Sequence, residues 1–281
     1  MEGSMVYTTK NKFAQIFFKN ILAWIASLIV IIPMLLVILN AFKADGETLN
    51  MNLQLPKEWI FSNFATVIEK GKLIKSFFNS LLYAGLGTVI TIFFGAMAAY
   101  VFSRRRSKGM AALYMYVVLG MVIPVNYVTL TKTMITLHLT NTKPGIILLY
   151  MALQTPFTIF LIYGFVSKIP VELDEAAVID GCSPLQLYIK IILPMLKSAV
   201  ITAGVLCFLN CWNEFMMPLY FLNSSEKWPM TLAIYNFFGQ YEMKWNLICA
   251  DVLLTCAPVL ILYLICQKYI VGGQTAGAVK G

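Results

Sequence analysis

Long stretches that lack charged side chains constrain this sequence more than any other feature. Six stretches contain at most one Asp, Glu, Lys or Arg each: Asn20–Asn40, Ser76–Ser103, Gly109–Thr131, Pro144–Ser167, Ser198–Ser225 and Trp245–Gln267. Only the last two carry a charge, Glu214 and Asp251 respectively. A helix of about 20 apolar residues crosses the hydrocarbon core of a bilayer. The sequence therefore predicts an all-α, polytopic membrane protein with six transmembrane helices.

The composition supports a membrane protein and argues against several other classes. Of the 281 residues, 59% are hydrophobic and only 12% are charged, whereas soluble domains contain about 25% charged residues. So little charge cannot cover a water-soluble globule, which argues against a soluble enzyme, a disordered chain and a secreted disulfide scaffold. We attribute the net charge of +8 to Lys and Arg retained in cytoplasmic loops, and expect no nucleic-acid partner.

The distribution of Lys and Arg predicts the orientation. Six spans place both termini on one side of the membrane, and that side holds 12 of the 21 Lys and Arg residues. Arg104, Arg105 and Arg106 lie in a very short loop, where cytoplasmic retention of positive charge is most reliable. We therefore expect a cytoplasmic segment at residues 1–19, a six-span domain at residues 20–270 and a cytoplasmic tail at residues 271–281.

The cytoplasmic loop at residues 168–197 is too long for a simple turn and predicts two short helices. Pro170 suits the first position of the first helix. Acids follow in its first turns, where the helix dipole favours them: Glu172, Asp174 and Glu175. Gly181 suits the C-terminal stop. The first helix is therefore expected to end in a glycine hinge.

The second helix of this loop is predicted directly after the glycine. Ser183 suits the N-cap and Pro184 the first helical position. An apolar stripe follows and ends at Pro194: Leu185, Tyr188, Ile191 and Ile192. A short helix gains little in water by itself. The stripe therefore predicts docking on a partner or, alternatively, on the lipid surface.

Three groups of residues carry a resemblance to a known family. The cytoplasmic loop resembles the EAA loop of permease subunits of ABC-type importers, at Glu175, Ala176, Ala177, Asp180, Gly181, Ile191, Leu193 and Pro194. The fifth predicted span resembles the signature of carbohydrate importers of the maltose and multiple-sugar class, at Asn210, Trp212, Asn213, Glu214, Phe215, Pro218 and Leu219. The segment from Lys268 to Gly281 resembles the C-terminus of one of the two permease subunits in that class.

This resemblance implies a type I ABC importer permease fold with a cytoplasmic coupling helix. In that family the coupling helix seats in a cleft of a cytoplasmic ATPase subunit. Twelve residues are expected to couple this chain to the ATPase: Glu175, Ala176, Ala177, Asp180, Gly181, Ser183, Pro184, Leu185, Tyr188, Ile191, Leu193 and Pro194.

The resemblance also implies partners, substrate and location. A homologous second permease would complete a heterodimer, two ATPase subunits would bind ATP and Mg²⁺, and an extracytoplasmic sugar-binding protein would deliver the substrate. That substrate is expected to be a carbohydrate, a di- or oligosaccharide, moved by alternating access. The implied location is the cytoplasmic (inner) membrane of a prokaryote.

The chain itself lacks the sequence signatures of a nucleotide, metal or catalytic site. It contains no Gly-x-x-x-x-Gly-Lys-Ser/Thr phosphate loop, so ATP hydrolysis is expected on another polypeptide and no cofactor on this chain. The chain has one histidine, His138, and no cluster of residues with zinc-ligand spacing. We therefore predict no metal site. The protein is therefore expected to be a transport subunit and not an enzyme.

The fifth predicted span supplies candidates for the translocation path. Asn210, Asn213 and Glu214 would bond to sugar hydroxyls, and Trp212 would stack on a sugar ring. The alternative is a structural hydrogen-bond network that holds this span. A second hypothesis is an ion-gradient-driven secondary transporter or channel in which Glu214 and Asp251 carry protons, because intramembrane carboxylates are costly and face protein or water.

Two further features leave alternatives open. A stripe of small residues in the second span favours close helix packing, either inside the bundle or at a subunit interface: Gly87, Thr91, Gly95 and Ala99. The outer connection Phe42–Lys75 is long enough to hold a short helix. It predicts a docking surface for an extracytoplasmic partner or, equally, a solvated loop with an interfacial Trp59.

Overall fold

The computed structural model describes residues 3–105, 107–238 and 243–278, with side chains described for residues 16–105, 107–238 and 243–267. The chain divides into two compact units. Unit 1 is Met1–Gly71 with Phe237–Leu254, and unit 2 is Lys72–Asn236 with Thr255–Gly281. The described ranges hold helices and no strand beyond an isolated bridge, which confirms the all-α prediction. The signature between Lys268 and Gly281 lies outside the described side chains.

Unit 1 is built around the end of a long apolar helix. Helix α1 (Gly3–Ala41) contains 39 residues, so the predicted boundary at residue 19 does not coincide with a helix end. A 3-10 turn, η1 (Asp45–Glu47), and helix α2 (Ser62–Lys70) follow. Helix α2 confirms the short helix expected in the outer connection. Helix α13 (Trp245–Ala278) begins in this unit.

A buried lysine ties the end of α1 to the following loop. The Lys43 side chain is only 1% exposed, and its Nζ donates to Oδ1 of Asn52 at 2.7 Å and to Oδ1 of Asn40 at 3.2 Å. Nδ2 of Asn63, in α2, donates to the carbonyl oxygens of Ala41 and Lys43 at 2.9 Å. These bonds satisfy polar groups that would otherwise be costly to bury.

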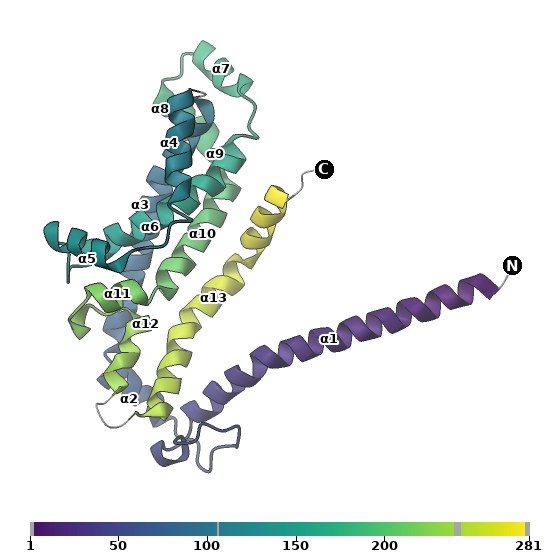
Figure 1. Cartoon of the computed structure of the whole chain (residues 1–281), viewed down its shortest axis with the longest axis vertical. Coiled ribbons are helices and arrows are strands. Elements are labelled where there is room, and N and C mark those ends of the chain that lie inside the picture. The colour runs from purple at the N-terminus through teal and green to yellow at the C-terminus, as the bar shows by residue number, and fades with distance from the viewer. Residues whose placement is uncertain (1–2, 106, 239–242, 279–281) are drawn as a thin grey trace. The chain divides into compact units, whose positions relative to one another are not determined.

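The core of unit 2 is formed by α3 (Leu73–Arg104), α6 (Lys143–Val166) and α10 (Lys197–Asn213), which pack together (Figure 1). Small residues of α3 allow this packing. A Cβ atom added to Gly87 would lie 3.2 Å from Cβ of Tyr150, and one added to Gly95 would lie 2.8 Å from Cγ2 of Thr158. The stripe of small residues therefore packs inside the chain, against α6, as one of the two alternatives predicts.

The six predicted spans are not all continuous helices. Within the described residues, four helices are long and apolar enough to cross a membrane: 16–41 of α1, α3, α6 and 245–267 of α13. The continuous helix expected over Gly109–Thr131 is wrong, because it forms α4 (Lys108–Leu119) and α5 (Tyr127–Thr136). Pro124 disfavours helical backbone at the preceding residue, and Oδ1 of Asn126 starts α5 by accepting two backbone N–H groups.

The fifth predicted span, Ser198–Ser225, is preceded by a bend and is itself divided. Residues 184–195, comprising α8 (Pro184–Leu187), a π-helical turn η2 (Tyr188–Ile192) and α9 (Leu193–Met195), meet α10 at an angle of 78°. Helix α10 stops at Asn213, and α11 (Met216–Phe221) follows. Unit 2 continues through η3 (Ser225–Lys227), α12 (Met230–Ala233) and η4 (Ile234–Phe237), whose last residue belongs to unit 1.

Helix α3 gives unit 2 two distinct ends. Its 32 residues span about 48 Å at about 1.5 Å per residue, enough to cross a bilayer. We call the C-terminal end of α3 the coupling end, because the loop at residues 168–197 contacts Arg104 there. The N-terminal end of α3 is the opposite end. The loop therefore lies on the same side of the membrane as Arg104 and Arg105, as the charge distribution predicts.

Candidate functional site

The loop at the coupling end begins with α7 (Glu172–Ile179), which ends in a glycine reversal. The N–H of Gly181 donates to the carbonyl of Val178 and the N–H of Cys182 to the carbonyl of Ala177, both at 3.0 Å. These two bonds form a Schellman motif. Gly181 has a φ of +78°, and an added Cβ would meet nothing within 4 Å. Backbone conformation, and not space, therefore requires glycine here.

The second helix of the loop starts as predicted. Oγ of Ser183 accepts from the N–H of Gln186 at 3.3 Å, and Oε1 of Gln186 accepts from the N–H of Ser183 at 2.9 Å. This capping box, with Pro184 at the first helical turn, confirms the predicted start. The reciprocal partner Gln186 was missed, although its position three residues after the cap is the usual signal.

The sequence predicted that the second helix ends at Pro194, but the helix continues beyond it. The ring nitrogen of Pro194 carries no hydrogen and cannot donate to a carbonyl of the preceding turn. The helix widens instead, and the N–H of Leu193 donates to the carbonyl of Tyr188 in a π-helical turn. The chain runs through α9 to Met195 and bends at Leu196. The widened turn therefore connects the loop directly to α10.

The predicted apolar stripe of the second helix packs mainly inside unit 2. Tyr188 and Ile192 are 8% and 0% exposed, and Ile191 packs against the same core. The ring of Tyr188 lies 5.6 Å from that of Tyr100 in α3. Of the predicted stripe, only Leu185 is largely exposed. A stripe shows that a face is covered, but here the chain's own helices cover most of it.

Two apolar side chains outside the predicted stripe are exposed on this loop together with Leu185. Ile179 is 85% exposed, Val178 63% and Leu185 59%. They flank the reversal at Gly181, and we call them the exposed apolar group. The sequence analysis did not single out Val178 and Ile179. They directly follow Ala177 in the same helix, and adjacent helical residues lie on different faces, so these residues could not all lie on the buried face of Ala177.

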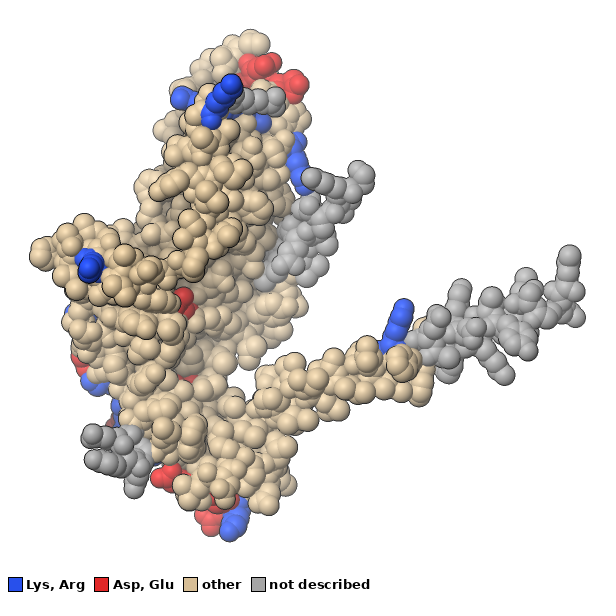
Figure 2. Space-filling view, viewed as in Figure 1, with Lys and Arg blue, Asp and Glu red and all other residues tan. Residues whose placement is uncertain are grey.

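The twelve predicted coupling residues divide between the surface and the core. Eight are exposed: Glu175, Ala176, Asp180, Gly181, Ser183, Pro184, Leu185 and Pro194. Ile191 and Leu193 are partly buried, and Ala177 and Tyr188 are buried. Figure 2 shows acidic side chains at the coupling end, close to Lys and Arg side chains. The exposed part of the loop thus combines acidic and apolar groups.

An ion pair anchors α7 to the end of α3. Nε of Arg104 donates to Oδ2 of Asp174 at 2.6 Å and Nη2 to Oδ1 at 3.4 Å. Nη1 of Arg104 donates to the carbonyl of Ile169 at 3.1 Å, and the hydroxyl of Tyr100 donates to Oδ2 of Asp174 at 3.3 Å. Both charged side chains are only 13% exposed. The sequence analysis used Arg104 to predict the membrane orientation and Asp174 as an acid favoured by the helix dipole. It did not predict that the two side chains form an ion pair.

The translocation candidates do not share one environment. Asn210 is exposed, and its Nδ2 donates to Oε1 of Gln154 in α6 at 3.2 Å; Asn213 is also exposed. Trp212 is 3% exposed and stacks on Phe208, with ring centroids 5.6 Å apart. The expected stacking of Trp212 on a sugar is therefore not available in this conformation. Gln154 was missed, although it is the one amide side chain in the predicted fourth span.

The two acids of the predicted spans, Glu214 and Asp251, both contact other parts of the protein. The carboxylate of Glu214 accepts from the N–H of Met217 at 3.1 Å, and its carbonyl accepts from Oγ1 of Thr231 at 3.1 Å. These two bonds tie Glu214 to the start of α11 and to Thr231 of α12. Asp251, in unit 1, is 1% exposed, and its Oδ1 has no hydrogen-bond donor among the described residues. Its burial in protein agrees with the expectation for an intramembrane carboxylate.

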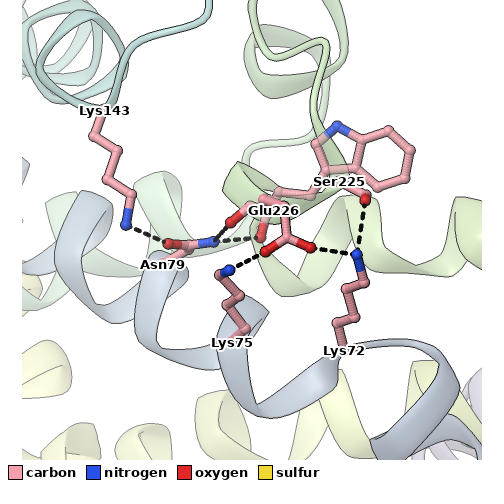
Figure 3. Close-up of polar contacts among 7 residues, drawn as sticks. Lys72, Lys75, Asn79, Lys143, Ser225 and Glu226 are labelled. Carbon is pink, nitrogen blue, oxygen red and sulfur yellow. Dashed lines mark hydrogen bonds and ion pairs between the residues drawn. The ribbon is translucent and has the colours of Figure 1, made fainter.

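A second polar cluster lies at the opposite end of α3 (Figure 3). Lys72 and Lys75 both pair with the carboxylate of Glu226. Nδ2 of Asn79 donates to the carbonyl of Glu226 at 3.1 Å, and Nζ of Lys143 donates to Oδ1 of Asn79 at 2.9 Å. The cluster attaches η3 to the first turns of α3.

Comparison with known protein families matches residues 91–271 to the binding-protein-dependent transport system inner membrane component. The chain is 32% identical, over 97% of its length, to the diacetylchitobiose uptake system permease protein NgcG of Streptomyces coelicolor, of which it covers 91%. It is 33% identical to the probable starch degradation products transport system permease protein AmyC of Thermoanaerobacterium thermosulfurigenes, over 95% of this chain and 97% of that protein.

The fold is also found in a solved structure. A chain in the crystal structure of a bacterial ABC transporter involved in the import of the acidic polysaccharide alginate matches with a TM-score of 0.81 and 22% identity. The match covers 93% of this chain and 97% of that chain. The family match runs from α3 through the loop at residues 168–197, which we call the coupling loop, into α13. This multi-pass membrane protein of a prokaryote is therefore a member of the family of binding-protein-dependent transport system inner membrane components.

Proposed function

We propose that this protein is the permease subunit of an ATP-driven importer that moves a di- or oligosaccharide across the cytoplasmic membrane by alternating access. Support for a carbohydrate comes from the relatives, which are named for diacetylchitobiose and for starch degradation products. Membership of a binding-protein-dependent family argues against the alternative, an ion-gradient-driven transporter or channel. The same membership supports an extracytoplasmic sugar-binding protein as a partner.

The partners inside the cell follow from the coupling loop. Two ATPase subunits, each binding ATP and Mg²⁺, and a homologous second permease complete the proposed assembly. The observation that carries this proposal is a helix that ends in a glycine reversal and is followed at once by a capped helix, with Ile179 and Leu185 exposed on either side of Gly181. Exposed apolar side chains on a rigid loop are suited to burial in a partner. Glu175 and Asp180 add carboxylates that bond to basic groups.

The loop is connected to the membrane helices in two places. The ion pair of Arg104 and Asp174 links α7 to α3, and the π-helical turn links α8 to α10 through the bend of 78°. Displacement of the loop by a nucleotide-driven ATPase would therefore move both helices. The amides of Gln154 and Asn210, which meet between α6 and α10, are proposed to line the path and bond to sugar hydroxyls.

The proposed ATPase contact is tested with Ile179→Glu combined with Leu185→Glu. The assembly is purified from native cells through a tag on this chain, and ATP hydrolysis is measured in vesicles with and without the sugar-loaded binding protein. We expect the ATPase subunit to be lost from the purified assembly, because two carboxylates would be buried unpaired in the contact. Leu55→Glu, which alters a leucine that is 72% exposed in unit 1, is the matched control for co-purification of the ATPase. An ATPase that still co-purifies and is still stimulated in the double variant contradicts the contact.

A further inference from the structure

A cavity of about 520 Å³ lies at the coupling end of unit 2, between the ends of α3 and α6 and the start of α4. It is separate from the exposed apolar group, since neither Ile179 nor Leu185 lines it. Val171, which precedes α7, forms one edge. The cavity is therefore adjacent to the base of the coupling loop.

The lining of the cavity carries excess positive charge. Arg104, Arg105 and Lys108 all line it. The carboxylate of Asp174 pairs with Arg104, while Arg105 and Lys108 form no ion pair with any acid among the described residues. Ser103, Ser107 and Ser167 also line the cavity. Cations such as Arg105 and Lys108 are groups that bind phosphate oxygens.

The lining also contains aromatic and apolar side chains. The rings of Tyr114 and Tyr163 stack with centroids 4.2 Å apart, and Phe102 packs against Tyr114 at 5.9 Å. Met115 and Ala111 of α4 also line the cavity, and this helix carries no charged side chain after Lys108. A free anion gains no stabilisation from these apolar side chains. A molecule with a charged head and an apolar tail matches both the charged and the apolar parts of the lining.

We propose that this cavity binds the headgroup of an anionic phospholipid, with its phosphate at Arg105 and Lys108 and its acyl chains along α4. The position favours a lipid over a free phosphate, because the cavity opens at the end of the membrane-spanning α3. Basic pockets between membrane helices on the cytoplasmic side are suited to such headgroups. A bound headgroup contacts Val171 and thereby braces the base of the coupling loop. The inference requires only that the protein spans a membrane, and so stands apart from the sugar substrate.

The test is native mass spectrometry of the purified assembly after delipidation. Short-chain phosphatidylglycerol, short-chain phosphatidylcholine and inorganic phosphate are added separately at equal concentrations, and phosphatidylglycerol is also added together with inorganic phosphate. We expect phosphatidylglycerol to bind selectively, and Arg105→Gln combined with Lys108→Gln to weaken its binding by about 25-fold, roughly fivefold from each cation. Lys57→Gln combined with Lys132→Gln changes the net charge equally at exposed lysines elsewhere and is expected to bind as the unaltered protein does.

Three results overturn the proposal. Equal binding of the two phospholipids by the unaltered protein removes the role of negative charge, and this comparison requires no variant to fold. Displacement of phosphatidylglycerol by an equal concentration of inorganic phosphate identifies a site for free phosphate. Equal losses in the two double variants show that only net charge matters and that the cavity does not.

Discussion

The ion pair of Arg104 and Asp174 offers the sharpest test of how the coupling loop is held. The change Asp174→Asn leaves the guanidinium of Arg104 without its counter-charge in a site where both side chains are only 13% exposed. Breaking a buried pair by removing one partner costs roughly 3 to 5 kcal/mol, and the remaining exposure places this site near the lower end. A loss of about 3 kcal/mol raises the open population of α7 by about 100-fold.

Hydrogen–deuterium exchange measures this opening directly in the purified protein. We expect the backbone amides of α7 to exchange about 100-fold faster in Asp174→Asn, while those of the α3 and α6 core stay unchanged. Glu175→Gln alters the neighbouring acid, which is exposed, and serves as the matched control. The charge reversal Arg104→Asp with Asp174→Arg is expected to restore much of the protection. Exchange of α7 that is the same in Asp174→Asn and in the control would refute the anchoring role.

Three further predictions concern other positions. Gly181→Ala forces an L residue to a φ of +78° and is expected to destabilise the reversal by about 1 to 2 kcal/mol, measured as faster exchange of Cys182 and its neighbours; unchanged exchange would contradict the strain. Gly95→Val is expected to lower the thermal unfolding temperature, because Cγ2 of Thr158 lies 2.8 Å from the new Cβ, whereas Gly85→Val meets nothing within 4 Å and is the control. Glu226→Gln is expected to cost at most about 1 kcal/mol, because its carboxylate and its lysine partners are 44–53% exposed. Thermal unfolding at low and high salt checks this value, and a larger loss that is insensitive to salt would contradict the solvent-screened description.

Local features of the coupling loop were predictable from the sequence. The start at Ser183 and Pro184 and the reversal at Gly181 depend on residues within one turn of each other, so no tertiary information is needed. The long charge-free stretches likewise predict apolar helices, since length and composition decide whether a helix can span a bilayer. The end of α4 at Leu119 was not predicted, because hydropathy does not report the backbone restriction that Pro124 imposes.

Features that depend on distant residues were not predictable. Arg104 and Asp174 lie in different helices, so neither pattern reveals that they meet. The amphipathic stripe around Tyr188 indicates a covered face, yet only the packing against Tyr100 and the rest of the core shows what covers it. Trp212 was expected to face a sugar because its neighbours are polar. Its side chain packs beside Phe208 instead, as helical geometry places adjacent residues on different faces.

Transport itself tests the central claim most directly. The assembly is reconstituted in vesicles with the binding protein, and uptake of a labelled oligosaccharide is measured with ATP on the ATPase side, without ATP, and with an imposed proton gradient in place of ATP. We predict uptake only with ATP, and its loss when Ile179→Glu and Leu185→Glu are combined. Uptake driven by the proton gradient without ATP, or unaffected by the double change, would contradict the account.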